Sequence, residues 1–448
     1  MISYDDLRDK SQEEKLAIAG EFYDREEYAQ AELTVSALLD VNPHERGAIA
    51  LLGAIYQRLD HYGMSEMVFR YGVALFPDFP PMWLGLGTAI RDPFRSEEAI
   101  KIFNHALELS PKNTVALTNL AAMYVEIGEY DKALEIAKES MKLNPDSVSA
   151  RDAVALASFG LEDFKTGWEH NKTSLGVKFR KEIVYGDEER WEGEKGKSVI
   201  IYGEQGIGDE IFYGSMIPDA IKDCKKVIID CDPRLEGLFK RSFPKAYVYG
   251  TRGLAGSWMK NHKWDARIAA ADLGSIYRNA KEDFKGEPFL KADPDRAAMW
   301  ASLFGSRTKI GIGLRGGNKY TNRTSRCIPI ETFRPLLEYG DLVSLEYSDF
   351  DYGKFPVESY AWATQSKDYD NVAALLSQLD YVVTTCTAVV HVAGGLGIPC
   401  FVLTPRYPGW RYAHDMPWYN SVHVIHCDGD FDEGMKEVVR LIELRKVA

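Results

Sequence analysis

A glycine-rich turn carrying two acids follows one of the strongly apolar runs in the second half of the sequence. The run Val199–Tyr202 predicts a buried strand, and residues 203–210 after it are Gly-Glu-Gln-Gly-Ile-Gly-Asp-Glu. Open α/β sheets bind ligands at such turns, at the carboxyl ends of their strands. Asp209 then falls in the first turn of a predicted helix, where the helix dipole stabilises a carboxylate that can act as a general base. The alternative is that Asp209 only caps the helix and that Gly206 and Gly208 only permit a tight turn.

A basic stretch surrounds a second predicted strand. Seven basic residues and no acid occur from Arg296 to Ile330, namely Arg296, Arg307, Lys309, Arg315, Lys319, Arg323 and Arg326. The strand Ile310–Leu314 is followed there by Arg315-Gly316-Gly317-Asn318-Lys319. Cations on flexible backbone at the carboxyl end of a strand suit phosphate. We therefore predict that Arg315, Asn318 and Lys319 bind a phosphate group, and a solvated basic loop is the alternative.

A second acid-free window, Thr384–His414, contains a predicted strand end followed by the start of a helix. The first backbone N–H groups of that helix, at Thr387, Ala388 and Val389, have no partner within it. With the Thr387 hydroxyl they can hold a pyrophosphate without any formal positive charge. His391 lies one turn further on and can reach the same phosphate, and a core histidine is the alternative. Cys386 has no base beside it in the sequence, so we do not expect a catalytic cysteine.

The composition indicates a globular protein of several domains. A length of 448 residues corresponds to roughly three ordinary domains, and 45% of the residues are hydrophobic. The net charge of −13 makes a general attraction to nucleic acid or anionic lipid unexpected. No apolar run approaches the roughly 18 residues that span a bilayer, and the first residues lack the features of a secretory signal. Six cysteines are scattered without zinc spacing, so we expect a cytoplasmic protein with reduced thiols and no metal site.

The N-terminal part contains a repeat of 34 residues. Prolines recur at that interval, at Pro43, Pro77, Pro111 and Pro145. The interval is the length of a tetratricopeptide unit, which is a pair of antiparallel helices. The four windows are 12–45, 46–79, 80–113 and 114–147, and they place similar residues in the same columns. We predict a stacked superhelix whose concave face recognises a protein partner, with self-association as the alternative.

The rest of the sequence alternates short β-branched runs with amphipathic helical stretches, which is typical of parallel α/β domains. Before it, the segment Arg151–Asn171 keeps helical spacing, and its Phe164 and Trp168 predict a capping helix for the repeats. The predicted fold class is therefore α + α/β. The predicted domains are residues 1–180 for the repeats with their capping helices, and 197–290 and 308–448 for two Rossmann-like halves.

Four motifs together resemble the bacterial tetratricopeptide-repeat glycosyltransferases. They are Gly203–Glu210, the Arg315-Gly316-Gly317-Asn318 loop with Arg326, Thr387–Pro399, and Trp410-Arg411 followed by Pro417-Trp418-Tyr419. The C-terminal part is similar to the lipopolysaccharide heptosyltransferases, and the plan of repeats followed by a two-domain transferase resembles that of O-GlcNAc transferase. The resemblance covers nearly the whole chain. It implies the GT-B fold, with an acceptor half followed by a half that binds the nucleotide-sugar donor.

The resemblance also implies an activity. An inverting transferase of this type moves a sugar from a nucleotide-sugar to an acceptor, here a protein held by the repeats, and needs no metal or cofactor. Asp209 matches the Asp that is the proposed base of the heptosyltransferases. The implied donor-binding residues are Gly206, Gly208, Arg315, Asn318, Lys319, Arg326, Thr387, Ala388, His391 and Arg411. Where those relatives usually carry an Asp before the Thr, this sequence has Cys386, so a binding protein without catalysis is the alternative.

Overall fold

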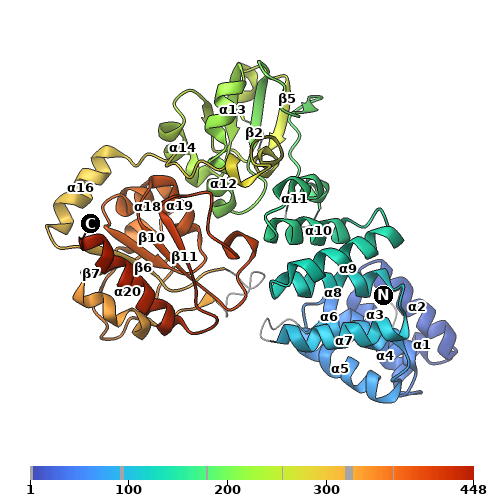
Figure 1. The fold of residues 1–448 in the computed structure, drawn as a ribbon. Coiled ribbons are helices and arrows are strands. Elements are labelled where there is room, and N and C mark those ends of the chain that lie inside the picture. Colours follow the sequence, from blue (N-terminus) through green and yellow to red (C-terminus); the bar gives the residue numbers. More distant parts are fainter. Residues whose placement is uncertain are drawn as a thin grey trace. The chain divides into compact units, whose positions relative to one another are not determined.

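A computed structural model of the chain describes residues 4–90, 95–177, 180–254, 256–317, 326–366 and 368–447. The chain divides into two compact units, Met1–Val154 and Ala155–Ala448 (Figure 1). The first contains helices and the second contains two parallel sheets with their helices. None of the helices among the described residues has the length and apolar character needed to cross a membrane.

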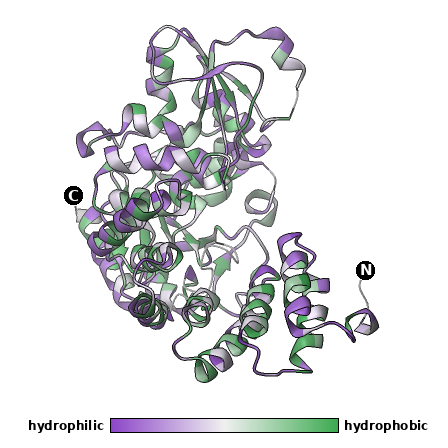
Figure 2. Ribbon diagram, turned by 90° about the vertical axis from the view of Figure 1, so that its right-hand side faces the viewer, coloured by the Kyte–Doolittle hydropathy of each residue, from purple (hydrophilic) through white to green (hydrophobic). Residues whose placement is uncertain are grey.

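The first unit is built from paired helices. Its helices are α1 (Tyr4–Leu7), α2 (Gln12–Asp24), α3 (Tyr28–Leu39), α4 (Arg46–Arg58), α5 (Tyr62–Leu75), α6 (Pro80–Ala89), α7 (Ser96–Leu109), α8 (Thr114–Glu126), α9 (Tyr130–Leu143) and the start of α10 (Val148–Gly160). The contacts between successive helices join α2 to α3, α4 to α5, α6 to α7 and α8 to α9, and each pair falls within one 34-residue window. Most of these helices carry both hydrophobic and hydrophilic residues, as helices with one packed face do (Figure 2).

Small residues let the two helices of a pair approach closely. A Cβ added to Gly53 of α4 would lie 2.5 Å from the ring of Phe69 on α5. The same relation recurs one repeat later, where a Cβ on Gly87 would lie 2.7 Å from the ring of Phe103. Both rings are buried. The repeated columns of the sequence are therefore packing positions, because each aromatic ring fills the space that a glycine leaves open.

The second unit contains two sheets in which every strand pair is parallel. The first sheet has the order β1-β5-β2-β3-β4, from β1 (Glu189–Arg190), β2 (Ser198–Tyr202), β3 (Lys226–Asp230), β4 (Tyr247–Tyr249) and β5 (Ala266–Ala269). The second has the order β11-β10-β9-β6-β7-β8, from β6 (Lys309–Gly313), β7 (Asp341–Ser344), β8 (Val357–Glu358), β9 (Tyr381–Thr384), β10 (Cys400–Thr404) and β11 (Val422–His426). Their central strands are almost wholly buried, as apolar strands covered on both faces must be. The prediction of helical repeats followed by parallel α/β structure is thus confirmed at this level.

Helices cover these sheets. They are α11 (Phe164–Asn171), α12 (Ile207–Gly214), α13 (Ile217–Asp223), α14 (Glu236–Ser242), α15 (Gly274–Tyr277), α16 (Pro294–Phe304), α17 (Ala361–Thr364), α18 (Tyr369–Leu376), α19 (Ala388–Leu396) and α20 (Phe431–Val447). The strand-to-helix connections place the carboxyl end of β2 before α12 and that of β9 before α19. These two junctions carry the glycine-rich and acid-free turns that the sequence analysis singled out.

The helix predicted to cap the repeats, α11, packs within the second unit. Phe164 and Trp168 of α11 are buried in the same core as both sheets. The Trp168 indole N–H donates to the carbonyl of Arg278 at 2.7 Å, and a Cβ on Gly274 would overlap the indole ring. The division by contacts falls at Val154, before α11, and the predicted domain bounds stay a prediction. The helical spacing was right, but its apolar face covers a sheet domain, which spacing alone does not reveal.

Candidate functional site

Asp209 lies at the start of α12, directly beyond the carboxyl end of β2. Its Oδ2 accepts a hydrogen bond from the N–H of Gly206, the residue before the helix, at 3.1 Å. Its Oδ1 lies 2.6 Å from the guanidinium of Arg411. The carboxylate therefore does cap the helix, as one interpretation of the sequence held, and it also forms an ion pair with a residue from the second half.

Arg411 reaches this carboxylate from the segment that follows β10. Its guanidinium carbon lies 4.6 Å from the centre of the Phe212 ring and 5.4 Å from that of Trp410. It also donates to the hydroxyl of Tyr213 at 2.9 Å. Although burial opposes it, the neighbouring Tyr213 and Asp209 raise the pKa of Arg411, so the cation is permanent. Within the described parts of the chain its Nε takes no hydrogen-bond partner, which leaves one buried donor unused.

The first turns of α12 and α19 meet at Gly208. The two helices are in contact, and both follow the carboxyl end of a strand (Figure 1). A Cβ on Gly208 would lie 3.2 Å from the Cβ of Ala388 and 3.6 Å from the ring of His391. Thr387 caps α19, and its hydroxyl accepts from the N–H of Val389 at 3.2 Å, so the prediction of a free donor at Val389 is wrong. The structure thus brings the predicted residues Gly206, Gly208, Asp209, Thr387, Ala388, His391 and Arg411 into one neighbourhood.

His391 is a buried histidine held by aromatic neighbours. Its two ring nitrogens lie 3.4 Å from the hydroxyl of Tyr412 and 3.3 Å from that of Tyr419. Burial, with the nearby Arg411 cation, lowers the pKa of His391 to about 3. The imidazole is therefore neutral near pH 7 and offers hydrogen bonds rather than charge.

The basic loop lies beside the start of α19, but its first arginine is already engaged. The Nε of Arg315 donates to Glu346 at 2.7 Å, and its Nη2 donates to the carbonyls of Ser348 and Asp349 at 3.2 and 3.1 Å. Binding a phosphate would require Arg315 to exchange these partners. The predicted residues Asn318 and Lys319 lie outside the described residues.

Cys386 and Arg326 flank the same turn. A Cβ on Gly316 would lie 2.8 Å from the carbonyl oxygen of Cys386, so the two turns touch through their backbones. The N–H of Gly316 donates to the carbonyl of Arg326 at 3.1 Å. Burial raises the pKa of the Cys386 thiol to about 12, although the Arg326 charge opposes this. Cys386 is thus a buried, neutral thiol.

The carboxyl ends of β2, β3 and β5, which we call the first carboxyl edge, hold a charge network that the sequence analysis missed. Arg180 is buried and lies 2.7 Å from Asp272 and 3.2 Å from Glu204. Asp230 accepts from Tyr185 and from the segment Thr251–Gly253 at 2.6 to 3.0 Å. The available signal was the acids that follow predicted strands. The arginine that pairs with them lies 92 residues from Asp272, and no local pattern connects the two.

Glu210, beside Asp209, belongs to this charge network and not to the contact between α12 and α19. Its Oε2 accepts from the N–H of Asp232 at 2.8 Å, and its Oε1 lies 3.2 Å from Arg252. Burial raises the pKa of Glu210 to about 8. Among the described residues no group of three or more His, Cys, Asp or Glu side chains is arranged to hold a metal ion.

The comparisons with known proteins identify the repeats. The tetratricopeptide-repeat family matches residues 94–157. Together with the helix pairs, this confirms that the N-terminal region consists of tetratricopeptide repeats. The peroxisomal targeting signal receptor of Kluyveromyces lactis is 30% identical over 115 residues, which cover 25% of this chain and 20% of the receptor.

One similarity extends beyond the repeats. Protein FlbA of Caulobacter vibrioides is 27% identical over 412 residues, which cover 83% of this chain and 68% of FlbA. Because the first unit ends at Val154, such a span includes much of the second unit. A thermophilic tetratricopeptide-repeat protein of Thermus thermophilus covers 37% of this chain and 90% of its own, at 19% identity and a TM-score of 0.33.

Proposed function

We propose that the second unit is a GT-B-type glycosyltransferase that moves a sugar from a nucleotide-sugar donor to an acceptor. The observation that carries the proposal is the meeting of two different turns. Asp209 supplies a carboxylate from the first half, and the start of α19 supplies neutral donors from the second half, with Arg411 between them. Sugar transfer from a nucleotide-sugar needs both a base for the acceptor hydroxyl and an anion site for the leaving diphosphate, and these two turns supply one of each.

In the proposed reaction the acceptor hydroxyl oxygen forms a bond to the anomeric carbon of the donor sugar. The bond from that carbon to the phosphate oxygen breaks, and its electron pair leaves with the nucleoside diphosphate. The hydroxyl proton passes to Asp209. The configuration at the anomeric carbon inverts, and the reaction needs no metal because the negative charge of the diphosphate is met by the α19 N-terminus and by arginine.

Arg411 has a specific task in this proposal. In the described structure its guanidinium occupies Oδ1 of Asp209, so this oxygen is not free to accept the proton of an acceptor hydroxyl. A donor diphosphate entering beside α19 offers the guanidinium a better bidentate partner, and the unused Nε is available for it. We propose that Arg411 passes from Asp209 to the diphosphate, so that donor binding frees the base. His391 stays neutral and holds the turn, and Arg315 and Arg326 lie on the adjoining loop.

The test is Asp209→Asn with Asp295→Asn as its control. Asp295 is also an acid in the first turn of a helix, α16, but it is exposed and away from the two turns. A panel of nucleotide-sugars is screened by thermal shift to find the donor, and transfer or donor hydrolysis is then measured. We expect Asp209→Asn to keep donor affinity and to lower turnover by at least about 100-fold, the size of a general-base contribution. Equal turnover in both variants would reduce Asp209 to a helix cap.

We further propose that the repeats hold a protein, which is the acceptor. The repeats support a role in protein interaction. The sequence predicts the concave face, and the structure adds a second candidate surface on α5, where Met64, Met67, Tyr71 and Leu75 are exposed by 42%, 66%, 46% and 36%. The corresponding helix α9 exposes charged residues instead, such as Glu135, Lys138 and Glu139. An apolar stripe on one helix of a stack is the mark of an interaction surface.

A non-catalytic scaffold is the second candidate function. Cys386 favours it, because a buried neutral thiol cannot take the polar contacts of the Asp that stands there in similar transferases. In that case the chain binds a nucleotide-sugar or a protein and catalyses no reaction. Donor binding that raises thermal stability, with no transfer or hydrolysis by the wild type for any acceptor, would favour the scaffold.

A further inference from the structure

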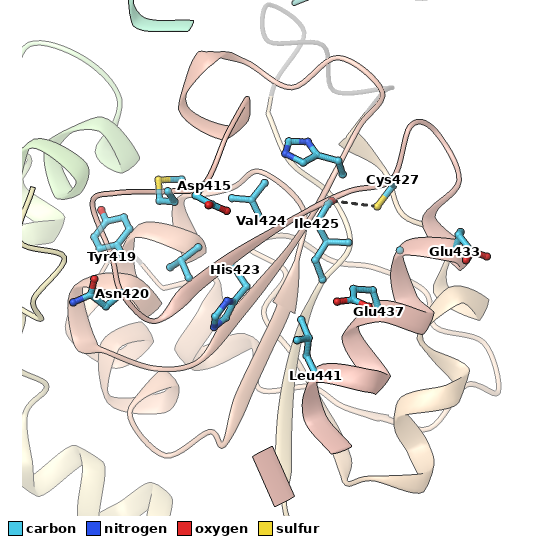
Figure 3. A pocket seen from close by; sticks show the side chains of 14 residues that line it. Asp415, Tyr419, Asn420, His423, Val424, Ile425, Cys427, Glu433, Glu437 and Leu441 are labelled. Carbon is cyan, nitrogen blue, oxygen red and sulfur yellow. Dashed lines mark hydrogen bonds between the residues drawn. The ribbon is translucent and has the colours of Figure 1, made fainter. Parts of the chain in front are cut away.

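The edge of the second sheet is lined by a groove. β11 is the last strand of that sheet, and a hollow of about 750 Å³ runs along it. Figure 3 shows side chains from the strand between Asp415, Tyr419 and Asn420 on one flank and Glu433, Glu437 and Leu441 of α20 on the other. This is a strand edge with a wall on each side.

The floor of the groove carries backbone groups that the sheet does not use. The N–H of Cys400 in β10 donates to the carbonyl of Ser421 at 2.9 Å. In a parallel ladder alternate residues turn both polar groups to the same neighbour, so 421, 423 and 425 face β10 and 422, 424 and 426 face outward. The N–H of Val422 bonds to the carbonyl of Tyr419 at 3.3 Å. Val424 therefore presents an N–H and a C=O at the centre of the open edge, where another strand can pair.

The groove is acidic. Among the described residues, those lining it include Asp415, Glu433 and Glu437 and neither lysine nor arginine, although the guanidinium of Arg445 lies 2.5 Å from the ring of His423. Burial and the neighbouring Arg445 lower the pKa of His423, and burial with the nearby His414 lowers that of His426, so both imidazoles are neutral at pH 7. The remaining lining is partly apolar.

Two of these carboxylates have cations of α20 beside them. Glu433 lies 2.5 Å from Lys436, and Glu437 lies 2.5 Å from Arg440. All four side chains are at least 40% exposed. Exposed pairs of this kind contribute little and exchange partners readily. The carboxylates remain available to a cation that arrives in the groove, and the apolar Met416, Ile425 and Leu441 can pack against aliphatic side chains.

We propose that this groove binds an extended peptide segment with lysine or arginine at alternate positions, which adds to β11 as a further strand. Main-chain hydrogen bonds to Val424 hold the segment in an extended form. Because alternate side chains of a strand point to the same face, its cations all lie on one side of the groove. A second copy of this chain fits less well, because pairing two β11 edges brings two acidic grooves together. Nucleic acid is repelled by the same charge. This inference does not depend on the glycosyltransferase proposal.

The probe is a fluorescent peptide of alternating lysine and valine with Gly-Ser ends, and the control peptide replaces each lysine by glutamate. Fluorescence anisotropy with the full chain measures binding. We expect the lysine peptide to bind, the glutamate peptide not to bind, and the affinity to fall as salt is raised. Equal binding of both peptides, or none of the lysine peptide, would overturn the proposal.

Variants separate the backbone from the charge. Val424→Pro removes the outward N–H while leaving the β10 side of the strand intact, and Val424→Ala keeps it. We expect Val424→Pro to lower the affinity for the lysine peptide by about tenfold, and Val424→Ala to leave that affinity nearly unchanged. Glu437→Lys should weaken it by a similar factor, whereas Glu338→Lys, an exposed acid outside the lining, should not.

Circular dichroism and thermal melting check that each variant folds. Because Glu437 lies on the exposed face of α20, its variant keeps the proposal testable even if Val424→Pro fails to fold. Analytical ultracentrifugation supplies the remaining outcome. A wild-type dimer that Val424→Pro converts to a monomer would assign the groove to a second copy of the chain and overturn the peptide proposal.

Discussion

The two sheets of the second unit differ in the residues that lie at the carboxyl ends of their strands. The first carboxyl edge is filled with paired charges, in which Arg180 bridges Asp272 and Glu204 and Asp230 accepts several donors. At the second sheet, the turn before α19 offers a capped helix start and a neutral histidine, and we call this the second carboxyl edge. The first edge has more charged residues, but they pair with one another in its buried interior. The proposed anion site lies instead at the second edge, where the start of α19 offers backbone N–H donors.

The largest expected effect comes from breaking the first edge. Arg180→Met leaves the buried Glu204 without its cation and leaves Asp272 with Arg190 alone, and loss of one partner of a buried pair costs about 3–5 kcal/mol of folding free energy. Urea unfolding of the purified chain measures it. Arg234→Met is the matched control, because Arg234 is more exposed beside Asp232 and should cost under about 1 kcal/mol. Equal costs would show that the first edge is not a buried charge network.

The next effect concerns pH and the second edge. The folded pKa of His391 is about 3, below its usual 6.5, so the unfolded chain binds the proton between these values. His391 therefore destabilises the fold as the pH falls below about 6.5, and its influence is absent above that pH. Relative to His391→Gln, wild type should lose about 3 kcal/mol between pH 7 and pH 4. Parallel stability profiles of the two proteins would mean that His391 is accessible to solvent and protonates freely.

A smaller effect tests the role of Thr387 at the second carboxyl edge. Thr387→Ala removes the cap of α19 and should cost about 1 kcal/mol of stability. Thr387→Ser keeps the hydroxyl and serves as the control. The alanine variant should also bind a nucleoside diphosphate more weakly, while the serine variant should bind it normally. A loss of stability with unchanged affinity would leave Thr387 a cap and nothing more.

Local patterns predicted much of this structure and few of its long-range pairs. The 34-residue interval of prolines predicted the paired helices, because each repeat packs on its neighbour in the same register. Strand runs followed by glycine or threonine reported the turns after β2 and β9. The Asp209–Arg411 pair could not be predicted, because it joins two halves through the tertiary fold. The same holds for Trp168, whose helical spacing was visible but whose burial against the sheet domain was not.

The most direct test of the proposed diphosphate site is calorimetric binding of nucleoside diphosphates, with matched arginine variants at the two carboxyl edges. Arg411→Gln removes the cation beside the second edge, and Arg252→Gln removes one from the first. We expect wild type and Arg252→Gln to bind at least one nucleoside diphosphate with similar affinity. Arg411→Gln should bind it about tenfold or more weakly, which is the loss expected for one charge-assisted contact. Weaker binding by Arg252→Gln with normal binding by Arg411→Gln would contradict the proposed site, and so would the absence of binding by the wild type.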